Sequence, residues 1–491
     1  MIEDIVKIHD RYQFEIKLNY QLENGAKENA YEVETYFFIP NSLGVNRRTY
    51  SKDDFYQDIK SYVRFKTPSL LLRQICSGEA APLENLRKSF VELAENTTSS
   101  AISSFEYHNK MFSAILKSAL RDHISLIFKK EHAGDLSDLV HRYIESTPKI
   151  VAEFRKLRKI INVPSVSEQV FAIYLFSDEY ISLLVEKYTY DLLELLKKKS
   201  QNDYEKFSGK LLGIIHREIQ HRQQNGYHSV PENDSDNESL IFRYSVLKKY
   251  LESVLYLNTD VEPEGRFWEH FLLSLAAGIA MIFATGVAFF SQRQYGNFTI
   301  PLFVALVISY MFKDRIKEVF REYFMRKISR SLFDHKTKIY MNSKFNIGKY
   351  REGFYFIRTD KVPEPVLKIR NKDRTLEFDN KFANESIILF RKQIRINPEI
   401  FENIYSDYQV DGINDILRFN VERFLNKMDN PRKALYVLTD ESFKKIYGER
   451  VYHVNMVIKY TMRQTVTHKR FRLVLNRNGI KRIEKVAVVT E

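Results

Sequence analysis

The chain has 491 residues, with 76 Lys and Arg against 63 Asp and Glu and therefore a formal net charge of +13. A single cysteine, Cys76, excludes an intrachain disulfide and any zinc site built from several cysteines. The positive charge favours an anionic partner, either nucleic acid or a membrane surface with acidic lipids. The first residues contain no apolar stretch, so we expect no cleavable signal peptide.

Residues 1–80 are predicted to form an N-terminal β-hairpin region. Apolar and polar side chains alternate strictly over residues 13–22, which is the period of a half-buried strand. Residues 23–27 supply a turn, and residues 30–40 read as a second strand. This hairpin either joins the sheet predicted at the C-terminal end of the chain or belongs to a separate sheet.

Residues 81–258 are predicted to form a cytosolic helical bundle. Ser165 and Glu168 make a capping-box start for a helix that runs for about thirty residues. Several helices of this length, joined by short turns, are typical of an elongated bundle. Carboxylates such as Asp178 and Glu179 are expected on the solvated faces of these helices.

The middle of the chain, residues 268–312, is predicted to be a transmembrane helical hairpin with spans at about 271–290 and 296–312. The first run has twenty residues without a charge, which as a helix covers about 30 Å, the thickness of the bilayer hydrocarbon. Only a short polar loop separates the two runs. The alternative is a helical hairpin buried in a large soluble core, where helices usually keep one wet face.

Small residues recur at every fourth position of the first run and predict close helix packing in the membrane. Such a ridge either packs the two spans of one chain together or drives self-association. Neither run contains an ionisable residue, which argues against a proton relay or a charge-selective filter. The predicted packing residues are Ala276, Ala280, Ala284, Ala288 and Gly278.

Residues 313–335 are predicted to form a basic amphipathic juxtamembrane helix. It either continues the second span or lies on the membrane surface, where its cations would meet anionic headgroups. Positive residues stay on the cytoplasmic side, so both termini are expected there, with the bacterial inner membrane favoured. The predicted lipid-contacting residues are Lys313, Arg315, Lys317, Arg321, Arg326, Lys327 and Arg330.

Residues 336–491 are predicted to form a cytosolic β-rich domain with one helix, at residues 411–428. A hairpin is expected around Asn371, and a strand at residues 385–396. The end of the chain reads as an antiparallel meander in which Asn478 and Gly479 give the clearest turn signal. The fold class is thus an α+β membrane protein, with a cytosolic helical bundle and an antiparallel β-rich domain around a two-helix transmembrane hairpin.

No catalytic, metal or cofactor motif stands out in the sequence. His216, His221 and His228 lie close together, but their spacing does not place them on one helix face as a zinc pair requires. We therefore expect no catalytic residue, no cofactor and no metal, although an active site assembled from distant residues stays open.

The sequence favours a two-span integral membrane protein that acts as a non-enzymatic scaffold, sensor or adaptor. Its expected partners are the lipid bilayer, anionic headgroups and a cytosolic protein, with a homo-oligomer as a further option and nucleic acid disfavoured. The alternative is an oligomeric channel or membrane-permeabilising effector gated by the cytosolic domains, because a hydrophobic constriction needs no charge. An enzyme acting on lipid or nucleotide is a third reading.

Overall fold

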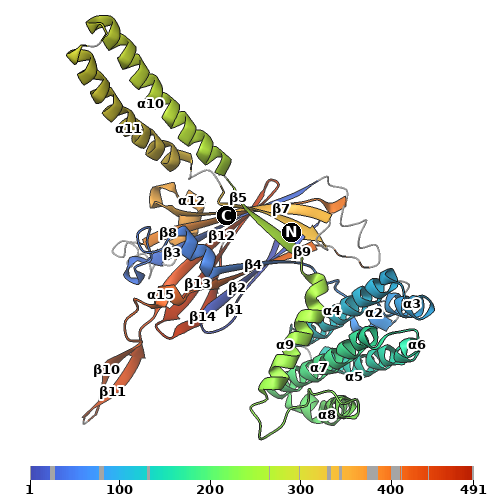
Figure 1. The fold of residues 1–491 in the computed structure, drawn as a ribbon. Coiled ribbons are helices and arrows are strands. Elements are labelled where there is room, and N and C mark those ends of the chain that lie inside the picture. Colours follow the sequence, from blue (N-terminus) through green and yellow to red (C-terminus); the bar gives the residue numbers. More distant parts are fainter. Residues whose placement is uncertain are drawn as a thin grey trace. The chain divides into compact units, whose positions relative to one another are not determined.

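The computed structural model describes residues 2–22, 28–76, 82–129, 133–264, 266–297, 299–328, 333–341, 345–372, 385–399, 408, 410, 412–440 and 442–488. It is an α+β protein, about half helix, and its sheets are antiparallel (Figure 1). The chain divides into two compact units. The first, here called the β unit, comprises residues 1–63, 257–400 and 414–491; the second, the helical unit, comprises residues 64–256 and 401–413.

The largest element of the β unit is an eight-stranded sheet whose strands come from both ends of the chain. Its order is β14 (Gly479–Val486), β13 (Thr465–Asn476), β12 (Tyr452–Met462), β3 (Asn29–Pro40), β8 (Glu385–Ile396), β7 (Phe345–Ile357), β6 (His335–Met341) and β5 (Asn258–Pro263). A four-stranded sheet has the order β1 (Ile2–Ile8), β2 (Gln13–Gln21), β9 (Gly412–Asn420) and β4 (Ile59–Phe65).

The two N-terminal strands predicted from the sequence form as β2 and β3, but they lie in different sheets. β2 pairs with β1, whereas β3 lies between β12 and β8. The turn predicted at residues 23–27 lies outside the described residues. The C-terminal meander is confirmed: β12, β13 and β14 are neighbours, and Gly479 begins β14 with a φ of +135° that favours glycine.

A two-stranded sheet, β10 (Arg432–Thr439) with β11 (Ser442–Glu449), is the third sheet described in the β unit.

A cluster of phenylalanines joins the eight-stranded and the four-stranded sheet. Phe55 lies on α1 (Lys52–Asp58), which begins with a capping box between Ser51 and Asp54. Its ring centroid lies 4.5 Å from that of Phe354 on β7 and 5.7 Å from that of Phe419 on β9. All three rings are buried, and such aromatic pairs stabilise a core beyond the area that they bury.

Two predicted elements of this unit differ from the structure. Most of the helix predicted at residues 411–428 is the strand β9, followed by the short helix α15 (Glu422–Leu425). Nearly every position of β9 is buried, because the strand is covered on both faces, so it lacks the alternation by which a strand is recognised. The hairpin expected around Asn371 begins instead with α12 (Glu364–Arg370), and residues 373–384 lie outside the described residues.

Eight α-helices and a short 3-10 helix, Glu252–Leu255, form the helical unit, within the residues that the structure describes. The α-helices follow one another along the chain. They are α2 (Leu72–Cys76), α3 (Pro82–Glu95), α4 (Ser99–Lys129), α5 (Ala133–Lys156), α6 (Arg158–Ile161), α7 (Glu168–Lys199), α8 (Gln201–Gln224) and α9 (Glu238–Leu251). The cap of α7 is Ser167 rather than Ser165. Rings of Phe112, Phe154 and Tyr174 stack in its core, with centroids 5.5 and 5.2 Å apart.

The β unit also contains two long helices that follow one another and run side by side: α10 (Arg266–Tyr295) and α11 (Ile300–Ile328) (Figure 1). Gly296, with a φ of +74°, lies in the turn between them. The apolar start of α11 and its basic second half are one continuous helix. The basic segment thus continues the second apolar run, one of the two arrangements that the sequence leaves open.

Candidate functional site

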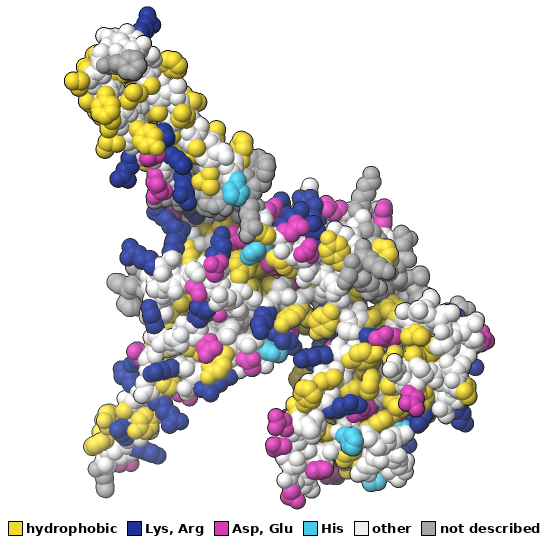
Figure 2. Space-filling view, in the orientation of Figure 1, with side chains coloured by type: hydrophobic (Ala, Val, Ile, Leu, Met, Phe, Trp, Pro, Cys, Tyr) yellow, Lys and Arg dark blue, Asp and Glu magenta, His cyan; other side chains and the backbone are white. Residues whose placement is uncertain are grey.

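The most unusual surface of the molecule is the apolar flank of α10. Of its most apolar stretch of 18 residues, only 17% are buried inside the chain. Many of its large apolar side chains are exposed. Figure 2 shows hydrophobic side chains gathered over this hairpin. The exposed set on α10 is Phe271, Leu275, Met281, Ile282, Phe283, Phe289 and Phe290. The described residues therefore do not bury this hairpin in a core, which was the alternative left by the sequence.

By length and composition, α10 is the one helix among the described residues that meets the requirements of an independent membrane span. Residues 270–295 of α10 meet both requirements. The apolar part of α11 ends at Lys313, so residues 300–312 cover only about 20 Å as a helix, less than the hydrocarbon thickness. The predicted second span is therefore wrong as an independent membrane helix, because its charged residues begin one to two turns too early.

Both ends of the helical hairpin leave the same edge of the eight-stranded sheet. β5 precedes α10, β6 follows α11, and the two strands pair from Asn258 opposite Tyr340 to Pro263 opposite His335. The Glu264 N–H also donates to the Asp334 carbonyl oxygen at 2.9 Å. The chain that leaves through α10 therefore returns to its starting point through α11.

The small residues predicted for helix packing fall on two sides of α10. Ala276 and Ala280 are fully buried, and Ala284 and Ala288 are half-buried, on the helix that packs along α11. The Ser309 hydroxyl of α11 donates to the Ala284 carbonyl oxygen at 3.3 Å. A Cβ added at Gly278, in contrast, would meet open space. Ala276 and Ala280 thus pack within this chain, whereas Gly278 is not at the helix contact.

The cations predicted to contact lipid lie on the second half of α11. Arg315, Lys317 and Arg321 are exposed, and the half-buried Lys313 ammonium lies 4.1 Å from the centroid of the Tyr310 ring. Figure 2 shows basic side chains adjoining the apolar part of the hairpin. The side chains of Arg326 and Lys327, and all of Arg330, lie outside the described residues.

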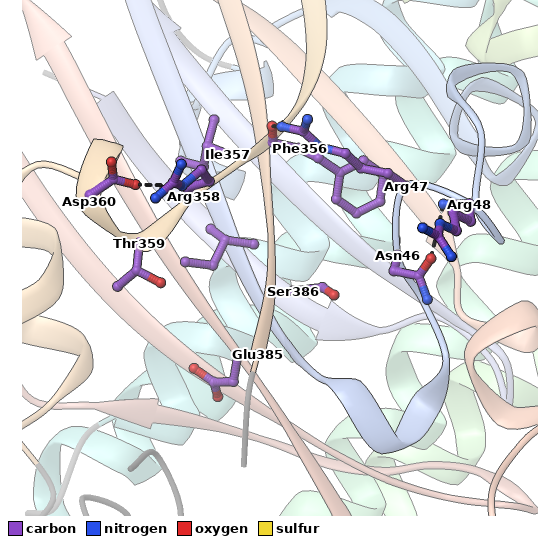
Figure 3. Close-up of a pocket in the computed structure, with 11 residues that line it drawn as sticks. Asn46, Arg47, Arg48, Phe356, Ile357, Arg358, Thr359, Asp360, Glu385 and Ser386 are labelled. Carbon is purple, nitrogen blue, oxygen red and sulfur yellow. Dashed lines mark hydrogen bonds and ion pairs between the residues drawn. The ribbon is translucent and has the colours of Figure 1, made fainter. Parts of the chain in front are cut away.

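A second candidate site is an open cleft of about 790 Å³ in the β unit, here called the arginine cleft. Three short segments line it: the loop before α1, the end of β7 with the turn after it, and the start of β8 (Figure 3). Its charged residues are Arg47, Arg48, Arg358, Asp360 and Glu385, and its neutral polar residues are Asn46, Thr359 and Ser386. No short sequence motif links the segments of this cleft, so it could not be predicted from the sequence.

Local hydrogen bonds hold the loop of the arginine cleft in place. The Asn46 side-chain oxygen accepts from the Arg48 N–H at 2.9 Å, which forms an Asx turn. One terminal nitrogen of the Arg47 guanidinium donates to the Phe356 carbonyl oxygen of β7. Gly44, with a φ of +66°, begins this loop, where a non-glycine residue would be strained.

The helical unit contains a buried ionic network centred on Asp178, which the sequence placed on a solvated face. Asp178 accepts from Arg155 at 2.9 Å, from His221 at 2.8 Å and from the Tyr227 hydroxyl at 2.9 Å. Burial raises the pKa of Asp178, but the hydrogen bond from His221 and the Arg155 charge outweigh that effect and lower it overall. Neighbouring Glu179 is also buried and pairs with Arg243, at 2.7 Å.

A buried lysine lies in the core of the β unit. Lys392 on β8 is 1% exposed, and its ammonium lies 2.9 Å from a Glu352 oxygen and 2.7 Å from an Asp415 oxygen. Burial lowers the pKa of Lys392, but the two carboxylates outweigh burial and raise it. The group has no described opening to solvent, so we interpret it as part of the core.

The histidines considered for a metal site do not converge. His221 belongs to the Asp178 network, while His216 and His228 are exposed. Among the described residues, no group of three or more His, Cys, Asp or Glu side chains is arranged to hold a metal ion. Comparisons with family models, curated proteins and solved structures find no match to this chain.

Proposed function

We propose that this is an integral membrane protein anchored by α10, with the apolar start of α11 lying beside it. The β unit and the helical unit would both lie in the cytosol, where the protein acts through contacts as a scaffold, sensor or adaptor. The observation that supports this most is the apolar flank of α10, which no described part of the chain covers.

The energetics favour lipid as the neighbour of this flank. Contiguous apolar patches on soluble monomers rarely exceed a few hundred Å², and larger ones mark interaction surfaces or cause aggregation. In a bilayer each Leu, Ile, Phe or Val near the helix centre contributes about −0.3 to −0.6 kcal/mol to insertion. The central side chains of α10 that face outward include Ile282 and Phe283, and none of the residues from 271 to 290 is charged.

The pairing of β5 with β6 supports a hairpin whose two ends stay on one side of the membrane. Arg293, at the end of α10, is the one Lys or Arg in residues 291–299. The second half of α11, in contrast, is rich in Lys and Arg. The cationic flank remains cytoplasmic by the positive-inside rule. The turn would then face the opposite side, which in a bacterium is the periplasm. Because the apolar part of α11 is too short to span alone, α11 would return across the membrane packed along α10.

An oligomeric channel finds less support. The most regular packing surface on α10 is the alanine ridge, and Ala276 and Ala280 of this ridge are already buried within the chain. A ring of spans would have to use the larger exposed side chains instead. Ion flux through liposomes containing the purified chain would favour the channel over the scaffold.

Membrane fractionation tests the anchor. The full-length chain is expected in the membrane pellet after alkaline carbonate washing, and only detergent should release it. In the matched variant a four-residue Gly-Ser linker replaces residues 265–332, which keeps β5 and β6 paired. This variant should move to the supernatant with its sheet intact by circular dichroism. A full-length chain that remains soluble without detergent would contradict the proposal.

Cysteine labelling tests the sidedness. In a Cys76→Ser background, R293C should react with a membrane-impermeant maleimide in intact spheroplasts. K317C, on the cytoplasmic half of α11, should react only after lysis. Equal labelling of both positions before lysis would contradict the topology while leaving membrane association intact.

A further inference from the structure

We propose that the arginine cleft binds a small phosphate-bearing anion of about nucleotide size. This site lies in the β unit, outside the α10–α11 hairpin, so the inference does not depend on the membrane anchor. It follows from the charge, the donors and the dimensions of the cleft.

The charge of the cleft favours an anion. Three guanidinium groups, of Arg47, Arg48 and Arg358, line it against two carboxylates. One of these carboxylates, Glu385, is already paired at 2.5 Å with the buried Arg370 behind the cleft. The remaining excess is two positive charges, counting three arginines against Asp360 alone.

The guanidinium groups have donors to offer to a ligand. One terminal nitrogen of Arg47 donates to a main-chain carbonyl of β7, which fixes the position of the guanidinium. The side chain is exposed, and a guanidinium has further N–H groups that can donate to a ligand. Arg358 pairs with Asp360 at 3.2 Å, and both side chains are largely exposed. Exposed pairs of this kind are weak, so a phosphate group can displace Asp360 from Arg358. Arginine often binds a phosphate group in a bidentate manner, through two parallel N–H···O hydrogen bonds.

The walls of the cleft favour a ligand with more than a bare phosphate. The half-buried Phe356 and Ile357 provide apolar surface, while Asn46 and Thr359 provide polar groups (Figure 3). A volume of about 790 Å³ lies within the range of small-molecule and cofactor pockets. A phosphorylated ligand with a planar or apolar portion uses both kinds of wall.

Calorimetric titration of the full-length chain in detergent tests the proposal, at about physiological ionic strength. The probes are inorganic pyrophosphate, ATP, and dihexanoyl phosphatidic acid as a lipid-headgroup arm, with sulfate as a reference anion. We expect saturable binding of one equivalent of a phosphate probe, tighter than that of sulfate. Tighter binding of ATP than of the lipid analogue identifies a soluble ligand, and the reverse order identifies a headgroup.

Two sets of variants separate a site from general charge. R47Q/R48Q/R358Q should weaken binding at least tenfold for each arginine that contacts the ligand. The control R432Q/K433Q/R482Q removes the same charge from exposed positions elsewhere in the β unit and should bind as the unaltered chain does. D360N should tighten binding a few-fold, because it frees Arg358. Equal binding by the two triple variants, or no preference for phosphate probes over sulfate, would overturn the assignment.

Discussion

Helices α7 and α10 are of nearly equal length, 32 and 30 residues, but they bury and expose opposite kinds of side chain. The centre of α7 buries charged groups, including Asp178 and Glu179, each with an arginine partner from another helix. The centre of α10 has no charged group and exposes its largest apolar side chains. A charged side chain can be buried in a protein when it is paired with an opposite charge. A wholly apolar surface is unfavourable in water and is stable when lipid or protein covers it.

The largest expected effect comes from placing charge on α10. I282R/F283R introduces two arginines at outward-facing positions, 75% and 40% exposed, near the centre of the apolar run. Each should disfavour insertion by about 3 kcal/mol, so most of the chain should leave the membrane pellet. The matched control is I241R/F242R on α9, where an Ile-Phe pair is also exposed. This control should remain in the pellet; if both variants behave alike, α10 does not face lipid.

A somewhat smaller effect is expected from removing the charge at the centre of α7. D178A leaves Arg155 and His221 without their carboxylate and should destabilise the helical unit by about 3–5 kcal/mol. Hydrogen exchange of the α7 and α8 amides measures this loss. The control E194A removes an exposed carboxylate of the same helix, which lies 3.8 Å from Lys198. It should change stability by less than about 0.5 kcal/mol.

The contact between α10 and α11 provides a finer test. A276L places a larger side chain at a fully buried position and should destabilise the hairpin by about 1–3 kcal/mol through overpacking. G278L adds the same side chain where a Cβ meets open space, and should have little effect. Titration of the purified chains with sodium dodecyl sulfate, followed by circular dichroism, compares the two. Equal sensitivity would mean that the alanine ridge does not lie at this contact.

The smallest expected effect is the pH dependence of the helical unit. Burial raises the pKa of Asp178, but hydrogen bonding and the Arg155 charge lower it overall, so its folded value lies below the unfolded one. Its contribution to stability is therefore complete above the unfolded pKa and is lost as the pH falls through the folded pKa. The limiting slope is about 1.4 kcal/mol per pH unit for one proton. Exchange of the α7 amides between pH 6 and 3 should show this slope, and D178N should reduce it.

The sequence predicts elements best where one physical cause dominates. Strict alternation identified β2 as a strand, a strand-like run after a turn identified β3, and the absence of charge identified α10 as an exceptional helix. Alternation, however, says which face of a strand is buried and not which strand lies beside it. That is why the separation of β2 and β3 into different sheets could not be read from residues 13–40.

Structure is hardest to predict from the sequence where burial depends on partners that are distant in the chain. Residues 412–420 place apolar side chains three and four apart, as in a helix, but they form a strand covered on both faces. Asp178 resembles any surface carboxylate until Arg155 and His221 fold against it. The arginine cleft likewise brings together segments more than 300 residues apart, joined by the hydrogen bond from Arg47 to Phe356.

The place of β3 in its sheet sets an order of events during synthesis. Residue 29 leaves the ribosome 433 residues before residue 462, which ends its partner strand β12. At roughly 5–20 residues per second, β3 waits about 20 to 90 seconds for this neighbour. Helices α10 and α11 are fully synthesised within that interval. Their apolar surface is therefore present while the eight-stranded sheet still lacks β12, β13 and β14 beside β3.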